Sequence, residues 1–443
     1  MSFLKTLFLS SRFFLVMASL IVILLLSYAF PFLLAIAETA GVLFLVLCGV
    51  DALLLYNRGV VVAVQRETPG LLSLGDDNPI RLSLMNKSRI QLRMEVIDEL
   101  PEQFQIRNLK IEVTLAPGTM HHETFILRPL TRGEYVFGKV HVYLTSNLGI
   151  IKRRISYALD VAVPVYPSII QMKKYELKTF ARTATEYGVK KVRRIGHSYE
   201  FDHIKQYTRG NDYRSINWKA TGRRAQLMVN QYEDEKSQQV YCIIDKSRVM
   251  HMPFHGLSLF DYAVNAALVI SNIVLGKQDK AGLITFAEVP KALIKAERGK
   301  PQLKRILETL YKEKEGSVEA NYESLYRSVR HFVNGRSLLF LYTNFESTFA
   351  LHRVLPQLRK LNDQHLLVVV IFENTEITST TSAQVDTLED IYTQVTAEHY
   401  TLTKVQIGQE LKQYGILTLL TRPQNLTVAT INKYLELKSR GMI

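Results

Sequence analysis

Residues 195–235 are dense in charged and aromatic side chains: IGHSYEFDHIKQYTRGNDYRSINWKATGRRAQLMVNQYEDE. Arginine makes forked, charge-assisted hydrogen bonds, and the single tryptophan of the chain offers a flat apolar face. Together these residue types are suited to binding an acidic protein segment or a phosphate group. The residues that we predict to make this contact are Arg209, Asp212, Arg214, Trp218 and Arg223.

A structural role for the same residues is the alternative, and the sequence favours it. In that interpretation Asp212 pairs with an arginine and Trp218 is buried against the edge of a sheet, because paired arginines and buried tryptophans are common scaffolding. The two interpretations differ in outcome. Arg214→Ala should unfold the domain if Arg214 is structural, and should leave it folded but unable to bind if Arg214 is functional.

The sequence lacks the usual catalytic signatures. It contains no Gly-x-x-x-x-Gly-Lys-Ser/Thr loop, no Gly-x-Ser-x-Gly elbow and no Gly-x-Gly-x-x-Gly fingerprint. His197, Glu200 and His203 have the spacing His-x-x-Glu-x-x-His, which differs from that of a zinc-binding His-Glu-x-x-His helix. We therefore predict no catalytic residues and no cofactor. The enzymatic alternative is a metal-assisted hydrolase that uses Asp245 with Asp212 or Glu200.

Composition indicates a folded chain with an uneven distribution of charge. The 443 residues are too many for one ordinary domain, and 47% are hydrophobic. Between Met172 and Arg224, fourteen Lys or Arg residues outnumber five Asp or Glu residues, within a chain of net charge +14. Such a segment attracts phospholipid headgroups, nucleic acid or an acidic protein face. The only cysteines, Cys48 and Cys242, lie in separate apolar runs, so neither a disulfide framework nor a thiolate metal site is expected.

Two apolar runs near the start of the chain predict a membrane anchor. Phe13–Phe30 and Ala40–Tyr56 each approach the ~20 residues that cross the hydrocarbon layer of a bilayer. The segment between them has no Lys or Arg, whereas four basic residues flank the pair: Lys5, Arg12, Arg58 and Arg66. The positive-inside rule therefore predicts a transmembrane helical hairpin in the inner membrane, with the soluble body in the cytoplasm.

A cleavable signal peptide is the alternative to this anchor, because Ala35-Ile36-Ala37 resembles a signal-peptidase site. The apolar run before that site is long for a signal peptide, which favours an uncleaved anchor. Asp51 lies near the end of the second run. We expect its carboxylate to reach headgroup water, although acids within membrane segments are often functional.

Residues 59–167 predict a β-sandwich, because short alternating runs are separated by polar turns. The expected strands are Val60–Gln65, Ile80–Leu84, Ile90–Ile97, Glu123–Leu127, Tyr135–Leu144 and Ile155–Val165. Residues 168–238 are mixed and basic, and we expect them to pack on the domain that follows. Residues 1–58 form the anchor in this division of the chain.

Residues 239–443 predict an α/β domain, because continuous apolar runs suited to buried strands alternate with amphipathic helices. The expected strands are Val240–Ile244, Ala281–Phe286, Ala292–Ala296, Ser337–Thr343, Leu366–Phe372 and Ile416–Leu420. In an open, largely parallel sheet of this Rossmann type, ligands bind at the carboxyl ends of the strands. The polar residues at that edge are Asp245, Ser247, Thr343 and Asn344.

The run from Gly196 to Glu235 resembles the signature of the DUF58 family. The resemblance rests on a Glu-Phe pair, a Tyr-x-x-Gly-x-Asp-x-Arg-x-Ile-x-Trp core, a following Arg and a Tyr-x-x-Glu, at Glu200, Phe201, Tyr207, Gly210, Asp212, Arg214, Ile216, Trp218, Arg223 or Arg224, Tyr232 and Glu235. Arg132-Gly133-x-Tyr135 and Val165-Tyr166-Pro167 also resemble segments of that family. The resemblance implies two membrane helices, a β-rich domain and a von Willebrand A-like α/β domain. It also implies a cytoplasmic partner, a MoxR-type AAA+ ATPase, that assists the assembly or metal loading of client proteins.

A von Willebrand A-like domain often holds Mg²⁺ at an Asp-x-Ser-x-Ser motif, completed by a Thr and an Asp from other loops. Asp245 and Ser247 match the first two positions, but Val249 replaces the second Ser and Asn344 stands where an Asp is usual. No clear Thr occurs near Ala320-Asn321. Because Mg²⁺ needs hard oxygen ligands, we expect a degenerate metal site without stable Mg²⁺ binding. Asp245 and Ser247 would then cap the following loop or helix.

The hypothesis that accounts for these features is a membrane-anchored, non-enzymatic scaffold that recruits a MoxR-type AAA+ ATPase. The alternatives are the hydrolase described above, a module that binds nucleic acid or another anionic surface, and a surface adhesin. Membrane attachment and the acidic residues within residues 195–235 make nucleic acid unlikely. The basic residues that flank the anchor oppose display on the cell surface.

Overall fold

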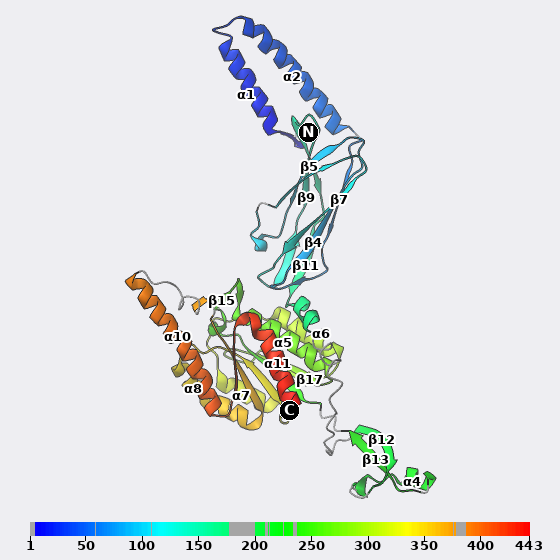
Figure 1. The fold of residues 1–443 in the computed structure, drawn as a ribbon, viewed down its shortest axis with the longest axis vertical. Helices are drawn as coiled ribbons and strands as arrows, with labels where there is room; N and C mark the ends of the chain where they lie inside the picture. Colours follow the sequence, from blue (N-terminus) through cyan, green and yellow to red (C-terminus); the bar gives the residue numbers. More distant parts are fainter. Residues whose placement is uncertain are drawn as a thin grey trace. The chain divides into compact units, whose positions relative to one another are not determined.

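The computed structural model describes residues 5–57, 59–107, 109–176, 200–208, 211, 213–224, 226–233, 237–374, 376–377 and 387–443. Two compact units divide the chain, Met1–Ser168 and Ile169–Ile443 (Figure 1). The first unit is rich in strands and the second alternates strands and helices. The predicted multi-domain organisation, with a β-rich N-terminal part and an α/β C-terminal part, is therefore confirmed.

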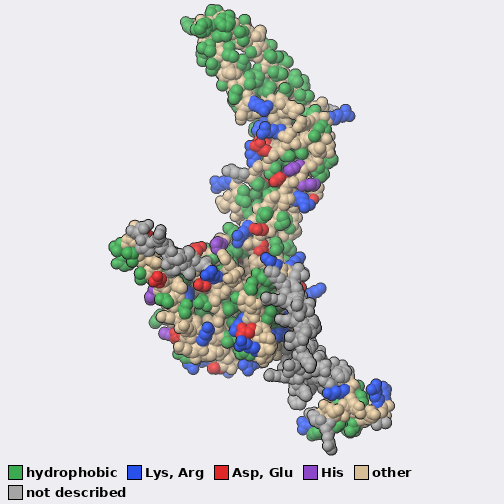
Figure 2. All heavy atoms as spheres, viewed as in Figure 1, with side chains coloured by type: hydrophobic (Ala, Val, Ile, Leu, Met, Phe, Trp, Pro, Cys, Tyr) green, Lys and Arg blue, Asp and Glu red, His purple; other side chains and the backbone are tan. Residues whose placement is uncertain are grey.

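The first unit begins with a hairpin of two apolar helices, α1 (Ser11–Leu26) and α2 (Phe32–Tyr56). Most of their side chains are exposed, and Figure 2 shows hydrophobic side chains covering the hairpin. Of the described helices, α2 and α5 (Leu259–Gly276) are long and apolar enough to cross a membrane, but α5 is mostly buried in the second unit. The helix α1 is shorter than the predicted run. The two exposed helices are consistent with association with a membrane.

Three sheets form the rest of the first unit. One has the order β1-β10-β9-β5-β6 (Leu7–Leu9, Ile151–Tyr157, Val140–Thr145, Leu92–Asp98, Lys110–Leu115). The second is β2-β4-β7 (Val62–Glu67, Asn78–Asn86, Met120–Leu127), and the third is β3-β11-β8 (Leu72–Ser73, Val161–Tyr166, Gly133–Phe137). Inward residues such as Leu82, Leu84, Met94 and Val142 form a core between the first two sheets, as the alternating pattern predicts.

Two predicted strands of this unit are in fact pairs of strands. The run Tyr135–Leu144 divides into β8 and β9 at a turn where the Gly138 N–H donates to the Glu99 carbonyl (2.9 Å) and the Lys139 N–H donates to Glu99 Oε2 (2.9 Å). The run Ile155–Val165 likewise divides into β10 and β11. The strands β1, β3 and β6 were not expected. The sequence pattern missed the turn between β8 and β9 because its stabilising partner, Glu99, lies 40 residues away.

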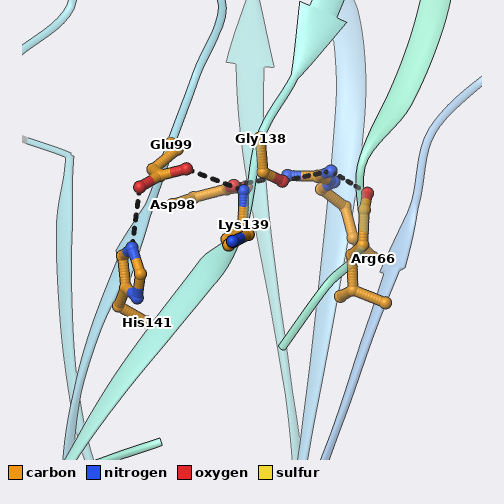
Figure 3. A network of polar contacts seen from close by, with 7 residues as sticks. Arg66, Asp98, Glu99, Gly138, Lys139 and His141 are labelled. Atoms are coloured by element: carbon orange, nitrogen blue, oxygen red, sulfur yellow. Dashed lines mark hydrogen bonds and ion pairs between the residues drawn. The ribbon is translucent and has the colours of Figure 1, made fainter. Parts of the chain in front are cut away.

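A buried ion pair joins the sheets of this unit (Figure 3). Arg66 Nη1 lies 2.5 Å from Asp98 Oδ1, and Arg66 Nη2 donates to the carbonyls of Gly138 (3.1 Å) and Leu159. Burial raises the pKa of Asp98, although Arg66 opposes this shift. In the folded chain Arg66 therefore lies inside the β-rich part, not at its surface as a flanking charge.

Asp51 of α2 is buried and bonded to the β-rich part, so the expectation that it reaches headgroup water is wrong. Its Oδ2 accepts hydrogen bonds from the backbone N–H groups of Ile150 and Ile151, each 2.9 Å, and its Oδ1 accepts from Ser146 Oγ. The last turns of α2 thus continue beyond the apolar hairpin into the β-rich part. Their partners lie 95 to 100 residues later, which no local pattern reveals.

Within the second unit, a short module begins with β12 (Glu200–Gln206) and ends with β13 (Met228–Glu233), and these two strands pair antiparallel. Between them are η3 (Tyr213–Ser215) and the helix α4 (Trp218–Arg224). The Asn217 side chain accepts from the Ala220 N–H (2.9 Å) and its amide donates to Asn230 Oδ1 (2.8 Å). Asn217 thereby fixes the start of α4 against β13. We call residues 200–233 the basic module.

The α/β part contains a six-stranded sheet of order β18-β17-β14-β19-β20-β21. Its strands are Ala292–Glu297, Lys280–Phe286, Gln239–Asp245, Leu338–Tyr342, Leu366–Phe372 and Leu417–Thr421. All neighbours are parallel except the edge pair β17–β18. The six expected strands are confirmed to within about two residues at each end.

Helices cover both faces of this sheet (Figure 1). On one face α5, α6 (Lys300–Lys312) and α11 (Leu426–Ser439) pack against Val240, Cys242 and Ile244. On the other, α7 (Tyr322–Phe332), α8 (Thr348–Gln364) and α10 (Leu388–Gln413) pack against Tyr241 and Ile243. Alternate residues of β14 therefore point into two separate cores, which explains its continuous apolar sequence.

Candidate functional site

The carboxyl ends of β14 and β19 meet at the middle of the six-stranded sheet. The chain proceeds from β14 to β17 on one side and returns to β19 on the other, so the strand order reverses between β14 and β19. In open α/β sheets such a reversal opens a crevice at the carboxyl edge. Asp245 ends β14 and Thr343 follows β19, and the structure brings the two side chains together there.

The Asp245 carboxylate is fully buried and accepts three hydrogen bonds. Thr343 Oγ1 donates to Oδ2 at 2.7 Å, the Tyr322 hydroxyl lies 3.4 Å from Oδ2, and the Ser247 N–H donates to Oδ1 at 2.9 Å. The Tyr322 hydroxyl also lies 2.7 Å from Thr343 Oγ1. Burial raises the pKa of Asp245, although these donors oppose the shift. Asp245 is thus held within a network of neutral donors.

Tyr322 is the residue of this site that sequence reasoning missed. It begins α7, directly after the cap Asn321, whose side chain accepts from the Ser324 N–H (3.0 Å). A threonine hydroxyl was sought at this point of the chain, and the tyrosine supplies a hydroxyl instead. The side chain is also buried in the core beneath α7, so its sequence pattern indicates only an apolar helix position.

Asn344 does not turn toward Asp245 as a further ligand. Its Oδ1 accepts a hydrogen bond from Lys404 Nζ at 2.6 Å, and Lys404 also donates to the Phe345 carbonyl. Lys404 is 2% exposed, and burial lowers its pKa to about 8. This α10 lysine therefore holds the loop after β19 in place. It is a second residue of the site for which the sequence offered no signal.

These contacts test the fit of Mg²⁺ to the predicted metal residues Asp245, Ser247 and Asn344. Both Asp245 oxygens already accept hydrogen bonds, and the Asn344 oxygen faces an ammonium group. Ser247 Oγ is buried and has no partner among the described residues. One hydroxyl and one engaged carboxylate do not compensate the dehydration of Mg²⁺. The described residues also place no group of three or more His, Cys, Asp or Glu side chains together for a metal ion.

A pocket of about 540 Å³ opens beside this site, against the start of α7 and α8. Its walls include Glu288, Glu319, Glu323, Arg353 and Tyr322. The wall has three glutamates and one arginine, although Arg353 pairs with Glu319 at 3.0 Å and Arg327 pairs with Glu323 at 2.5 Å. The buried Asp245 network thus lies behind a tyrosine that also lines an acidic, solvent-open pocket.

The basic module presents its aromatic and basic side chains to solvent. Trp218 is 71% exposed and Tyr213 is 69% exposed, so the expected burial of Trp218 against a sheet edge is wrong. Arg214, which contacts the Tyr213 ring at 5.7 Å, and Arg223 are also exposed. The remaining predicted residues of this group, Arg209 and Asp212, lie outside the described residues, as do the side chains of Glu200 and His203.

The module folds without burying these side chains. Its interior contacts come from Met228 and Val229, which are 4% and 1% exposed. Lys219 and Arg224 are exposed beside Trp218, and residues 213–224 include no acidic residue. Four cations and two aromatic rings are therefore exposed within one short segment. Such a surface is suited to an anionic partner.

Comparison with known proteins finds a family model that matches part of this chain. Residues 203–402 match the family model described as "Protein of unknown function DUF58". The predicted resemblance to DUF58 is confirmed over those residues. The chain is also 25% identical over 248 residues to "Uncharacterized protein YeaD" of Bacillus subtilis (strain 168), an alignment that covers 54% of this chain and 59% of that protein.

Solved structures give weaker likenesses. The hypothetical protein BatB of Bacteroides thetaiotaomicron is 12% identical with a TM-score of 0.30, and covers 46% of this chain and 99% of its own. The CARDB domain of PF1109 from Pyrococcus furiosus is 13% identical with a TM-score of 0.18, and covers 24% of this chain and 93% of its own. Scores this low do not assign a fold, so the strand order and register define it.

Proposed function

We propose that this chain is a membrane-anchored, non-enzymatic adaptor that recruits a cytoplasmic MoxR-type AAA+ ATPase for the assembly or activation of client proteins. The observation that carries the proposal is the exposure of Trp218 beside Arg214 and Arg223. A large aromatic side chain left in solvent among arginines is the composition of an interaction hot spot. The partner face that it fits is acidic, with an apolar patch for the indole ring.

The second unit supports a platform role. We infer that its α/β part is a von Willebrand A-like domain of the Rossmann type, and the six-stranded, largely parallel sheet with the crevice at Asp245 supports this inference. The engagement of Asp245 with Thr343 and Tyr322 favours a positional role for this carboxylate over the hydrolase alternative. We therefore assign the crevice and its acidic pocket to recognition, and the energy-consuming chemistry to the ATPase.

The anchor supports the location. The apolar hairpin of α1 and α2 would hold the adaptor in the inner membrane, and the basic residues at its base favour a body on the cytoplasmic side. Protease treatment of intact cells, spheroplasts and lysates tests this orientation. Cleavage of the body in intact cells would contradict it.

Affinity purification after crosslinking in cells tests the recruitment. Full-length protein should recover a MoxR-type ATPase, identified by mass spectrometry, and Trp218→Ala combined with Arg223→Glu should reduce the recovery at least tenfold. Lys304→Glu is the matched control, since Lys304 is an exposed cation on α6 with only a distant, 3.8 Å, ion pair. Equal recovery by the double variant, or failure of the wild type to recover any AAA+ ATPase, would contradict the proposal.

Binding of another anionic surface is the second candidate, because residues 213–224 combine four cations with no acid. For nucleic acid this predicts affinity that falls steeply with salt. Titration of a single-stranded oligonucleotide at two salt concentrations distinguishes the candidates. Tight, salt-dependent binding that is lost in Trp218→Ala would favour this function over ATPase recruitment.

A further inference from the structure

Exposed basic side chains gather at the end of the first unit from which the apolar hairpin emerges (Figure 2). Lys5 and Arg12 precede or begin α1, and Lys87 and Arg89 lie in the turn between β4 and β5. All four are exposed. The structure shows no ion pair between any of them and a described acid. The turn residues lie about 30 residues beyond α2 in sequence, so the fold and not the chain order brings them here.

Backbone contacts place these segments at one end of the unit. The Lys87 N–H donates to the Val61 carbonyl at 2.9 Å, just beyond the end of α2. Arg12 Nη1 donates to the Leu148 carbonyl at 3.3 Å. Gly149, at φ +74°, leaves room for this arginine, because a Cβ there would lie 2.8 Å from its Nη1. The four cations therefore lie near the base of the hairpin, although they come from two different parts of the chain.

Exposed apolar side chains lie among these cations. In β1, Phe8 is 37% exposed and Leu9 is 41% exposed, and Leu9 pairs with Ile151 of β10. The hairpin beyond them is apolar on nearly all of its surface. Cations next to apolar and aromatic groups are the pattern of a surface at the level of lipid headgroups.

Hydrogen bonds between the helices and the β-rich part fix the position of this surface along the apolar helices. Asp51 bonds α2 to Ile150 and Ile151, Arg153 Nη1 donates to the Leu55 carbonyl at 2.7 Å, and Ser10 Oγ donates to the Gly149 carbonyl at 2.6 Å. From Phe32 to Val50, before Asp51, α2 rises roughly 28 Å at 1.5 Å per residue. That length approaches the ~30 Å of the hydrocarbon core, so the cations would lie where the headgroups begin.

We propose that Lys5, Arg12, Lys87 and Arg89 form a collar that binds the phosphate groups of anionic phospholipids. The inference rests on the proposed membrane anchoring and adds to it a headgroup class and a binding surface on the β-rich part. A Lys or Arg near an anionic bilayer gains about 1 kcal/mol, and here no described acid offsets that attraction. The collar holds the β-rich part against the bilayer, and the bonds of Asp51 make this orientation rigid.

The test uses the full chain reconstituted in phosphatidylcholine bilayers that contain trace spin-labelled phosphatidylglycerol or phosphatidylcholine. Electron paramagnetic resonance measures the motionally restricted fraction of each lipid. The wild type should prefer phosphatidylglycerol severalfold, and Lys87→Glu with Arg89→Glu should lower that preference at least threefold. These two residues are chosen because they lie outside the helices that insert and outside their flanking sequence, whereas changes at Lys5 or Arg12 would also alter the topology signal.

The matched control is Arg107→Glu with Arg128→Glu, two exposed cations at the opposite end of the same strands. This control should keep the wild-type preference. Lys87→Gln with Arg89→Gln, which removes charge without reversing it, should give an intermediate loss and serves if the reversal variant folds poorly. A preference unchanged in both collar variants, or lost equally in the control, would overturn the collar.

Flotation of the reconstituted vesicles separates this outcome from failure of the anchor. If the full chain does not float with vesicles of any composition, the proposed membrane anchoring is wrong and the collar with it. If the chain floats but shows no headgroup preference, anchoring stands and only the collar is overturned. Raising the salt to 0.5 M should weaken the preference, because exposed charges are screened.

Discussion

The hydroxyl of Tyr322 lies 3.4 Å from Asp245 Oδ2 and 2.7 Å from Thr343 Oγ1, so a tyrosine closes the crevice at the carboxyl edge of the sheet. A buried carboxylate needs either a cation or hydrogen-bond donors. Here the donors are neutral. These neutral donors satisfy the hydrogen-bonding capacity of Asp245 without a cation, and a solvent-open pocket lies on the outer side of Tyr322.

This arrangement predicts weak binding of divalent cations. Calorimetric titration of the full chain with Mg²⁺ or Mn²⁺ should show no binding in the micromolar range. Tyr322→Phe should not create such binding, because Val249 and Asn344 still lack the required ligands. The lost hydroxyl should cost about 1 kcal/mol of unfolding free energy. Micromolar affinity in the wild type that disappears in Asp245→Ala would contradict this account.

The raised pKa of Asp245 predicts how stability depends on pH. The folded protein binds a proton at this carboxyl at a higher pH than the unfolded chain does. Its favourable contribution is therefore full below the unfolded pKa and is lost as pH rises through the folded pKa. Asp245→Asn should remove this loss, so the stability of the variant relative to the wild type should rise with pH across that window. Denaturant unfolding measured at several pH values tests the slope, and parallel profiles for the two proteins would contradict it.

Lys404 predicts a second pH dependence of opposite sign. Burial lowers its pKa to about 8, whereas the unfolded side chain titrates near 10.5. Between these values the unfolded chain holds the proton and the folded chain does not, so stability should rise with pH across this window by roughly 3 kcal/mol. Lys404→Met, which keeps the length of the side chain, should abolish the rise. Lys412→Met, at an exposed position of α10, is the control and should retain it.

Because Asp51 bonds α2 to the β-rich part, we predict that removing its carboxylate lowers the stability of that part. Asp51→Ala leaves the N–H groups of Ile150 and Ile151 and the hydroxyl of Ser146 without their acceptor in a buried place. The expected loss is about 3 kcal/mol of unfolding free energy, together with faster proteolysis of the loop at 146–150. Glu38→Ala, an exposed acid on the same helix, should change neither quantity. Equal protease resistance of wild type and Asp51→Ala would show that the loop does not depend on this carboxylate.

The sequence predicted the α/β part well and its site only in part. Strands such as Val240–Ile244 are buried on both faces, so their apolar runs identify them without any knowledge of their neighbours. Asp245 and Thr343 were placed at one edge by the same reasoning, and they do meet there. The pattern could not identify Tyr322 or Lys404, because each is a helix residue whose partner lies in another segment, 77 and 60 residues away.

For the basic module, by contrast, the sequence led to a wrong expectation about burial. Its residue types indicated binding, but the general tendency of tryptophan to be buried favoured a structural interpretation, and the 71% exposure of Trp218 contradicts the burial which that interpretation required. Local hydrogen bonds of Asn217 with Ala220 and Asn230 stabilise the module without the indole ring. The local sequence alone therefore does not distinguish a buried tryptophan from an exposed one when the packing partners are polar or lie far away in the chain.

Trp218 also provides the last prediction, because it is the only tryptophan in the chain and its fluorescence reports on the module alone. Emission from the full chain should be that of a solvent-exposed indole. Iodide should quench it more strongly than caesium, because Arg214, Lys219 and Arg223 concentrate anions around the ring.

Arg214→Ala should lower iodide quenching of Trp218 while leaving the free energy of unfolding within about 0.5 kcal/mol of the wild-type value. Val229→Ala, at a position 1% exposed, should instead destabilise the module by about 1 kcal/mol or more. Unfolding in Arg214→Ala, or emission typical of a buried indole in the wild type, would return this segment to a structural role and remove the main support for partner recruitment.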